Sequence, residues 1–409
     1  MSGIFFTEEE KRFREEVREF ARKIIAPEAD KIEKGMYPGM LLKKIGEAGY
    51  MRQLHPVECG GTAKGVVYEM IVAEEISGVN ASTDMARTAS STLSAIPISR
   101  FGTSEQKRKY LTPIIKGEKI GALGITEPFI GSDVTGMKTR AIRRGSEYVI
   151  NGEKRFITNG ADAHSITLFA ITNPDTAAKQ GMGAFIFPTD TEGFRVEKVY
   201  ELMGMHGLRV AHLKFKDCRV STENLLGSEG MGFQILMDEL DTERVSIAGE
   251  MIGIARAAYE TAVKYSTERE QFGKKISSFE GISFKIADMA TLLDAAELLT
   301  LRAARLIDQG ATASKESAMA KVFSVDHAFE VCNQALQVLG GIGYTAEYPL
   351  ERYLRDVRIG MLGGGTSEMM RFLIQREVYK EHRRKDEMEK LATPVRFSSV
   401  PRSEAKTSD

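Results

Sequence analysis

The hydrophobic pattern changes its period twice along the 409 residues, and this change constrains the fold more than any other feature. Apolar residues recur at helical spacing up to about residue 120, alternate as in strands from there to about 228, and then return to long helical periods. The pattern therefore predicts an α+β protein with an N-terminal all-α domain (1–120), a middle antiparallel β-barrel or sandwich (121–228) and a C-terminal four-helix bundle (229–385). The polar residues 386–409 lose the periodicity and are expected to form a disordered tail.

Local signals place the expected elements within these three regions. Thr7-Glu8-Glu9-Glu10 is a capping-box sequence that predicts a helix to about Asp30. Asn151-Gly152 predicts a tight hairpin turn between strands 147–150 and 154–157. The other expected helices are 41–48, 66–77, 86–100 and 103–116 in the first region, and 231–265, 279–309, 315–339 and 366–384 in the last. The other expected strands are 166–172, 183–188, 194–200 and 211–220.

Composition excludes several classes of function. The formal net charge is -1 and there is no basic block, so neither nucleic acid nor a membrane surface is an expected partner. Cys59, Cys218 and Cys332 lie far apart without a metal-ligand spacing, so we expect neither disulfides nor a metal site. Met1 leads directly into a charged helix, and no long apolar segment follows, which predicts a cytoplasmic setting.

The long helix that begins near Met231 carries ionisable residues beside its apolar stripe. Glu243 and Arg244 fall on the two flanks of that stripe, at the border of the expected core. A carboxylate there is costly unless it is paired, hydrogen-bonded or shifted in pKa. The helix alone leaves two interpretations open, a structural ion pair or a functional acid.

Five further stretches occur in a fixed order along the chain. They are 124–133 (GITEPFIGSD), 154–160 (KRFITNG), 269–274 (REQFGK), 337–341 (QVLGG) and 355–359 (RDVRI). In this order and spacing, over about residues 5–385, the chain resembles the acyl-CoA dehydrogenase family. The resemblance implies FAD as cofactor, an acyl-CoA substrate, an electron-transfer flavoprotein as electron acceptor, and a homotetramer in which the cofactor lies between subunits.

The resemblance also implies the residues that bind FAD. Those expected to line the flavin and acyl pocket are Leu123, Ile125, Thr126, Gly131 and Ser132, with Ser132 also near CoA. Those expected on the flavin ring are Phe156, Ile157 and Thr158. A neighbouring subunit would contribute Arg269, Gln271, Phe272, Gln337, Val338, Gly340 and Gly341, and the last cofactor contacts would be Thr366 and Glu368. Two positions depart from the family pattern, since Phe156 stands where Trp is common and Glu280 where Gln is common.

The usual catalytic carboxylate of the family is absent. Its YEGT motif reads Gly363-Gly364-Gly365-Thr366 in this chain. The resemblance to the isovaleryl-CoA and long-chain branches places the base before the Arg of an L-D-x-x-R pattern, which implies Glu243. Gly364 would still offer its N–H to the thioester carbonyl. The substrate contacts implied around them are Leu240, Asp241, Arg244 and Gly365.

The acyl group and the electron acceptor remain open. Arg87 either binds a carboxylate on the acyl chain, as for a benzylsuccinyl-type thioester, or forms a local pair with Asp84 at i,i+3. Branched and aromatic acyl groups are further candidates. The expected activity is α,β-dehydrogenation to the 2,3-enoyl-CoA. An acyl-CoA oxidase, an enoyl-CoA reductase and a catalytically silent flavoprotein scaffold are the alternatives.

Overall fold

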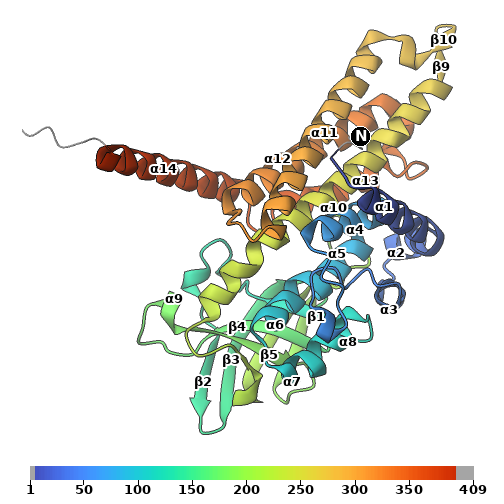
Figure 1. The fold of residues 1–409 in the computed structure, drawn as a ribbon. Helices are drawn as coiled ribbons and strands as arrows, with labels where there is room; N and C mark the ends of the chain where they lie inside the picture. The colour runs from blue at the N-terminus through green and yellow to red at the C-terminus, as the bar shows by residue number, and fades with distance from the viewer. Residues whose placement is uncertain (1–4, 393–409) are drawn as a thin grey trace, which may run out of the picture.

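The computed structural model describes residues 5–392 and confirms the predicted fold class. Helices of the first and last thirds of the chain pack together, and the sheet of the middle third lies against the N-terminal helices (Figure 1). Within the described range no helix is both long and apolar enough to cross a membrane.

The N-terminal part is helical, as expected, although several of its helices contain short π or 3-10 turns. Thr7 and Glu10 form the predicted capping box, in which each side chain accepts a hydrogen bond from the other residue's N–H. The α-helices are α1 (Glu8–Phe20), α2 (Ala29–Glu33), α3 (Gly39–Glu47), α4 (Val66–Ser77), α5 (Ala81–Thr88), α6 (Ala95–Phe101), α7 (Ser104–Gln106) and α8 (Thr112–Ile115). The π turns are η1 (Ala21–Ile25), η4 (Ala89–Ser94) and η5 (Lys107–Leu111), and the 3-10 turns are η2 (Ala26–Glu28) and η3 (Val57–Cys59).

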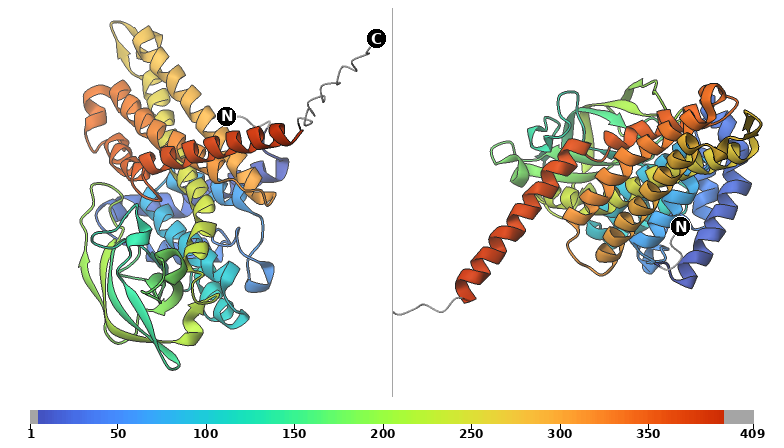
Figure 2. Two further views of the ribbon diagram at one scale, coloured as in Figure 1. Left: turned by 90° about the vertical axis from the view of Figure 1, so that its left-hand side faces the viewer. Right: turned by 90° about the horizontal axis from the view of Figure 1, so that it is seen from above.

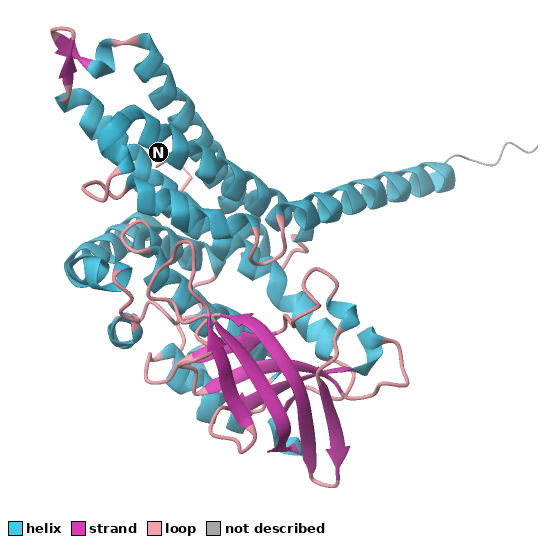
Figure 3. Cartoon of the chain, turned by 180° about the vertical axis from the view of Figure 1, so that it is seen from behind, coloured by secondary structure: helices cyan, strands magenta, loops and turns pink. Residues whose placement is uncertain are grey.

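The middle part is one eight-stranded sheet in the order β6-β7-β3-β2-β4-β5-β8, with β1 paired to β4 (Figure 3). Its pairings are antiparallel as predicted, apart from β1 with β4 and β2 with β4, which are parallel. The strands are β1 (Gly121–Gly124), β2 (Arg140–Arg144), β3 (Glu147–Ile157), β4 (Ser165–Ile171), β5 (Met182–Pro188), β6 (Phe194–Val199), β7 (Ala211–Ser221) and β8 (Leu225–Leu226). The short helices in this part are η6 (Val134–Gly136), α9 (Ala178–Gly181) and η7 (Thr222–Asn224).

The hairpin predicted at Asn151-Gly152 is wrong. Both residues lie inside the single long strand β3, which pairs with β2 and β7 on its two sides. The register against β7 shifts between Ile150 and Gly152, and Gly152 has φ +150°. The extra residue of this irregularity lies on β7, where Lys216 and Asp217 together stand opposite Asn151, and Asp217 has φ +52°. The Asn-Gly pair therefore lies opposite a bulge of β7 and makes no turn. The turn of the hairpin lies earlier, between β2 and β3.

The C-terminal part contains the four long helices at their predicted places. They are α10 (Gly232–Glu268), α11 (Glu280–Asp308), α12 (Ser314–Leu339) and α14 (Ser367–Ala392). The smaller elements are β9 (Glu270–Gln271), β10 (Lys274–Lys275), η8 (Ile276–Ser278), η9 (Gly340–Tyr344), α13 (Leu350–Val357) and η10 (Arg358–Met361). The first three long helices pack side by side, whereas α14 projects away from the rest of the chain (Figure 2). It also continues beyond residue 385, so the predicted tail begins later than expected; residues 393–409 of that tail lie outside the described residues.

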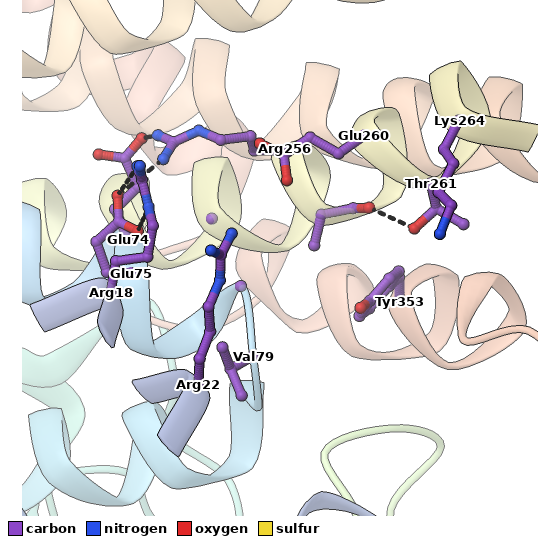
Figure 4. A pocket seen from close by; sticks show the side chains of 13 residues that line it. Arg18, Arg22, Glu74, Glu75, Val79, Arg256, Glu260, Thr261, Lys264 and Tyr353 are labelled. Carbon is purple, nitrogen blue, oxygen red and sulfur yellow. Dashed lines mark hydrogen bonds and ion pairs between the residues drawn. The ribbon is translucent and has the colours of Figure 1, made fainter. Parts of the chain in front are cut away.

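Charged side chains join the N-terminal helices to the bundle. Nη2 of Arg14 lies 3.0 Å from Oε2 of Glu74 and 2.9 Å from Oε1 of Glu297. Nη1 of Arg256 lies 3.0 Å from Oε1 of Glu75. Burial and the nearby Arg14 lower the pKa of Arg256 to about 9. A cavity of about 310 Å³ adjoins this cluster between α4 and α10 (Figure 4), and none of the predicted site residues lines it. The cluster therefore belongs to the packing between domains.

Candidate active site

Glu243 and Gly364, the two predicted catalytic residues, meet in the structure. Glu243 lies on α10 with 7% of its surface exposed. A Cβ atom built on Gly364 would lie 3.2 Å from Oε1 of Glu243 and 2.4 Å from Cδ1 of Ile247. Gly364 has φ +61°, a conformation that side chains rarely adopt. The backbone of Gly364 therefore lies uncovered beside the Glu243 carboxylate, and an acidic side chain at position 364 would not fit there.

The structural ion pair that was the alternative for Glu243 forms with a different acid. Nη1 of Arg244 donates to Oδ1 of Asp241 at 2.7 Å, and Oδ2 of Asp241 accepts from the Ser314 hydroxyl at 2.7 Å. Asp241 is thus tied to Arg244 and to the start of α12. No ion pair within 4 Å engages Glu243 in the part of the chain that the structure describes.

The electrostatic environment of Glu243 suits a base. Burial raises its pKa, and the cations Arg244 and Lys321 only partly oppose this effect. One helical turn earlier, Glu239 is 1% exposed, and neither of its oxygens has a hydrogen-bond partner among the described residues. Burial and the nearby Glu243 raise the pKa of Glu239 well above its ordinary value. Sequence periodicity did not single out Glu239, because it shows a position on the helix but not the groups that face it.

The residues expected on the flavin ring lie at the irregular end of β3. Phe156 has φ +58°, and the register against β7 shifts between Lys154 and Ile157. The ring of Phe156 is 55% exposed and lies 5.0 Å from the Tyr200 ring, which leaves it available to stack on a planar cofactor. Ile157 instead points into the core of the sheet with 3% exposed, so it faces a cofactor only through its backbone.

A buried ion pair fixes the Thr-Glu-Pro segment beside that strand. Nζ of Lys154 donates to Oε1 of Glu127 and to the carbonyl of Ile125, both at 2.9 Å. The N–H of Arg155 donates to the Thr126 carbonyl at 2.7 Å. Burial lowers the pKa of Lys154 to about 8. Ile125 and Thr126 are therefore held beside Phe156, and the pairing that holds them was not visible in the sequence.

Other predicted residues occupy less buried positions around the same region. Leu123 ends the core-facing part of β1, and Thr158 follows β3. Gly131 and Ser132 form the exposed turn after the bridge between Glu127 and Ile130. Thr366 and Glu368 stand at the start of α14, and Leu240 and Gly365 border Glu243 and Gly364 along the chain.

The second predicted cofactor set lies at the opposite end of α10. Arg269 follows the last residue of α10, 26 residues after Glu243, and at 1.5 Å per residue this is about 39 Å. Phe272 is 93% exposed at the tip of the β9–β10 hairpin. The other exposed residues of this predicted set are Gln271, Gln337, Gly340 and Gly341. Val338 differs from them, because its side chain is buried in the helical core.

The structure gives Arg87 a structural role. Its side chain is fully buried, with Nε donating to Asp84 at 2.6 Å and Nη1 to Glu69 at 2.8 Å. Nη2 donates to the Thr88 hydroxyl at 3.1 Å. All three guanidinium nitrogens are therefore engaged by neighbouring protein groups. The local pair with Asp84 is present, and the charge of the buried guanidinium is already opposed by two carboxylates. The sequence showed the i,i+3 pair but not Glu69, which comes from α4.

Comparison with known proteins agrees with the fold. The acyl-CoA dehydrogenase N-terminal, middle and C-terminal domains match residues 7–118, 122–218 and 230–379. The probable acyl-CoA dehydrogenase YngJ of Bacillus subtilis is 42% identical over 91% of this chain and 99% of its own. A chain in the structure of the electron transferring flavoprotein of Acidaminococcus fermentans is 42% identical, with TM-score 0.89 and coverage of 91% and 98%. Butyryl-CoA dehydrogenase from Megasphaera elsdenii is 36% identical, with TM-score 0.88 and coverage of 91% and 99%.

The domain order and these relatives define an FAD-dependent oxidoreductase that acts on acyl-CoA. The chain belongs to the acyl-CoA dehydrogenase family. The exposed ring of Phe156 suits the cofactor of this family, because it offers an aromatic face in front of the Thr-Glu-Pro segment.

Proposed function

We propose that this protein removes hydrogen across the α,β bond of an acyl-CoA thioester, with Glu243 as the catalytic base. The observation that carries the proposal is the buried Glu243 carboxylate beside Gly364, which forms no ion pair with the residues that the structure describes. FAD, when bound, accepts the hydride from the β-carbon. The products are then the 2,3-enoyl-CoA and a proton on Glu243.

Two groups of this chain act on the thioester. The Glu243 carboxylate takes the α-proton, and its raised pKa brings its basicity closer to that of the acid it must ionise. The Gly364 N–H donates to the thioester carbonyl, whose oxygen gains negative charge as the α-proton leaves. The resemblance that places the base before Arg244 and the geometry beside Gly364 support the same assignment, and they argue against a silent scaffold.

We further propose a neutral acyl group as the substrate. Arg87 is fully buried and its charge is already opposed by Asp84 and Glu69, so the geometry does not favour a terminal carboxylate on the substrate. The similarity to a butyryl-CoA dehydrogenase supports a short aliphatic chain. Branched and aromatic acyl groups belong in the same test panel.

The distance between the two cofactor sets supports an oligomer. Within one chain the Arg269 set lies far from the catalytic base, because about 39 Å of α10 separate Glu243 from Arg269. A second copy of the chain would bring its Arg269 and Phe272 to this copy's Phe156. We therefore propose a homotetramer built from such pairs, with an electron-transfer flavoprotein as the electron acceptor.

The test is flavin bleaching by acyl-CoA thioesters without oxygen. The Glu243→Gln variant should bind FAD normally and lose about 10²- to 10⁴-fold in the bleaching rate constant. The exposed Glu192→Gln is the matched control and should behave as the wild type. Near-normal bleaching by Glu243→Gln would sink the assignment of the base, and no bleaching of the wild type by any thioester would favour the scaffold. Oxygen consumption with butyryl-CoA separates an oxidase from a dehydrogenase.

A further inference from the structure

Three consecutive glycines form the loop beside Glu243, and the fixed conformation of this loop needs an explanation. Gly363, Gly364 and Gly365 carry no side chains, and the last two have φ of +61° and +88°. Glycine loses more conformational entropy on ordering than any other residue. A loop of this composition holds one conformation only where neighbouring groups fix its peptide planes.

Lys321 supplies that contact. It lies on α12 with none of its surface exposed. Its Nζ donates to the Gly363 carbonyl at 2.7 Å and also to the Gly365 carbonyl. The ammonium thus binds the carbonyl groups on both sides of Gly364. Nothing in the assigned chemistry uses this lysine.

The geometry of the peptide bond links Lys321 to the N–H of Gly364. The Gly363 carbonyl and the Gly364 N–H belong to one peptide plane, and in a trans peptide they point in opposite directions. Because Nζ of Lys321 donates to the Gly363 carbonyl oxygen, the Gly364 N–H points away from the lysine. Among the described residues this N–H has no hydrogen-bond partner.

We propose that Lys321 is a positioning residue, which holds the Gly363–Gly365 loop so that the Gly364 N–H faces the thioester carbonyl. The inference rests on the proposed function and adds a residue that the family motifs do not assign. Glu243 and Arg244 on α10, Asp326 on α12 and Glu368 on α14 act electrostatically on Lys321. Its charge therefore acts on the base as well as on the loop.

The protonation of Lys321 supports this role at neutral pH. Burial and Arg244 lower its pKa to about 8, whereas Glu243 acts to raise it. Below that pH the ammonium carries three N–H groups, enough for both carbonyls. A buried ammonium with two carbonyl acceptors is also less costly than an unpaired one.

The experiment separates the N–H donor from the base. Acetoacetyl-CoA bound to the FAD-loaded enzyme loses a C2 proton to buffer, and the resulting negative charge is delocalised onto its carbonyl oxygens, so the apparent pKa of the bound ligand, read from enolate absorbance, reports the donor. Lys321→Met should raise this apparent pKa by at least about one unit, and it should lower the bleaching rate constant by roughly 10- to 100-fold with a smaller change in ligand affinity. Lys321→Gln keeps an N–H donor without the charge and should show a smaller rise.

Two variants make the result specific. Lys315 lies on the same helix and forms an ion pair with Glu381. The Lys315→Met variant should change neither the apparent pKa of acetoacetyl-CoA nor the bleaching rate constant. Glu243→Gln should lower the apparent pKa of acetoacetyl-CoA, since it removes a negative charge beside the enolate. The same variant should lower the bleaching rate constant by about 10²- to 10⁴-fold, since it removes the base. Failure of the proposed function would therefore appear in Glu243→Gln, and failure of this inference in Lys321→Met.

Three outcomes overturn the inference. The first is an unchanged apparent pKa in Lys321→Met. The second is an equal rise of the apparent pKa of acetoacetyl-CoA in Lys321→Met and Lys321→Gln, which would assign the effect to the charge of Lys321 alone. The third is loss of FAD from both variants, which would assign Lys321 to the maintenance of the fold.

Discussion

At the scale of single residues, Glu243 and its neighbour Arg244 make a prediction about the pH dependence of the reaction. The base must be ionised to accept a proton, so the bleaching rate constant at saturating acyl-CoA should rise with pH through the raised pKa of Glu243 and be lost below it. Arg244→Gln removes a cation that favours the carboxylate. The rising limb of the pH profile should therefore move to higher pH. A limb that stays in place or moves to lower pH would show that Arg244 does not act on the base.

Glu239 makes a separate prediction about stability. Its pKa is raised in the folded protein, so the folded state keeps a proton that the unfolded chain releases above about pH 4.3. The free energy of unfolding therefore falls as the pH rises from there toward the raised value, and the protonated form is the stable one. Glu239→Gln should flatten this slope and stabilise the protein by roughly 1 to 3 kcal/mol at pH 8.

Urea unfolding at pH 5, 7 and 9 measures this slope. The exposed Glu192→Gln should keep the slope of the wild type. Equal slopes in wild type and Glu239→Gln would mean that Glu239 is ionised in the folded state at neutral pH.

At the scale of secondary-structure elements, the close approach of β3 to Thr139 can be tested with two glycines. A Cβ atom on Gly152 would lie 2.5 Å from Oγ1 and 2.7 Å from Cα of Thr139, whereas one on Gly145 would have no neighbour within 4 Å. Both have positive φ. Gly152→Ala should therefore destabilise the protein by about 2 to 4 kcal/mol, and Gly145→Ala by only about 1 to 2 kcal/mol. Thermal unfolding measures the difference, and equal losses would contradict the close approach to Thr139.

The same elements show how far sequence reasoning reaches. Helical periodicity located α10, α11 and α12 to within a few residues, because each presents a long apolar stripe to a common core. The Asn151-Gly152 pair misplaced the hairpin turn, because it lies inside a strand opposite a bulge of β7, which is not visible in the local sequence. In the site, motif order led to Glu243 and Gly364, which the structure brings together. Lys321 and Lys154 escaped notice, since their partners are backbone carbonyls and acids that are distant in the sequence.

At the scale of the whole molecule, the separation of Glu243 from Arg269 predicts active sites shared between copies. One variant, Glu243→Gln, should lack the base, and another, Arg269→Ala, should bind FAD weakly. In a mixed pair of the two, the site that uses Glu243 of the second chain and Arg269 of the first is intact. Equal mixing during refolding or co-expression should therefore restore about one quarter of the wild-type sites, measured as flavin bleached by butyryl-CoA. Activity no greater than the sum of the two separate variants would show that each chain binds FAD with its own residues, and would require α10 to bend or the Arg269 set to serve another purpose.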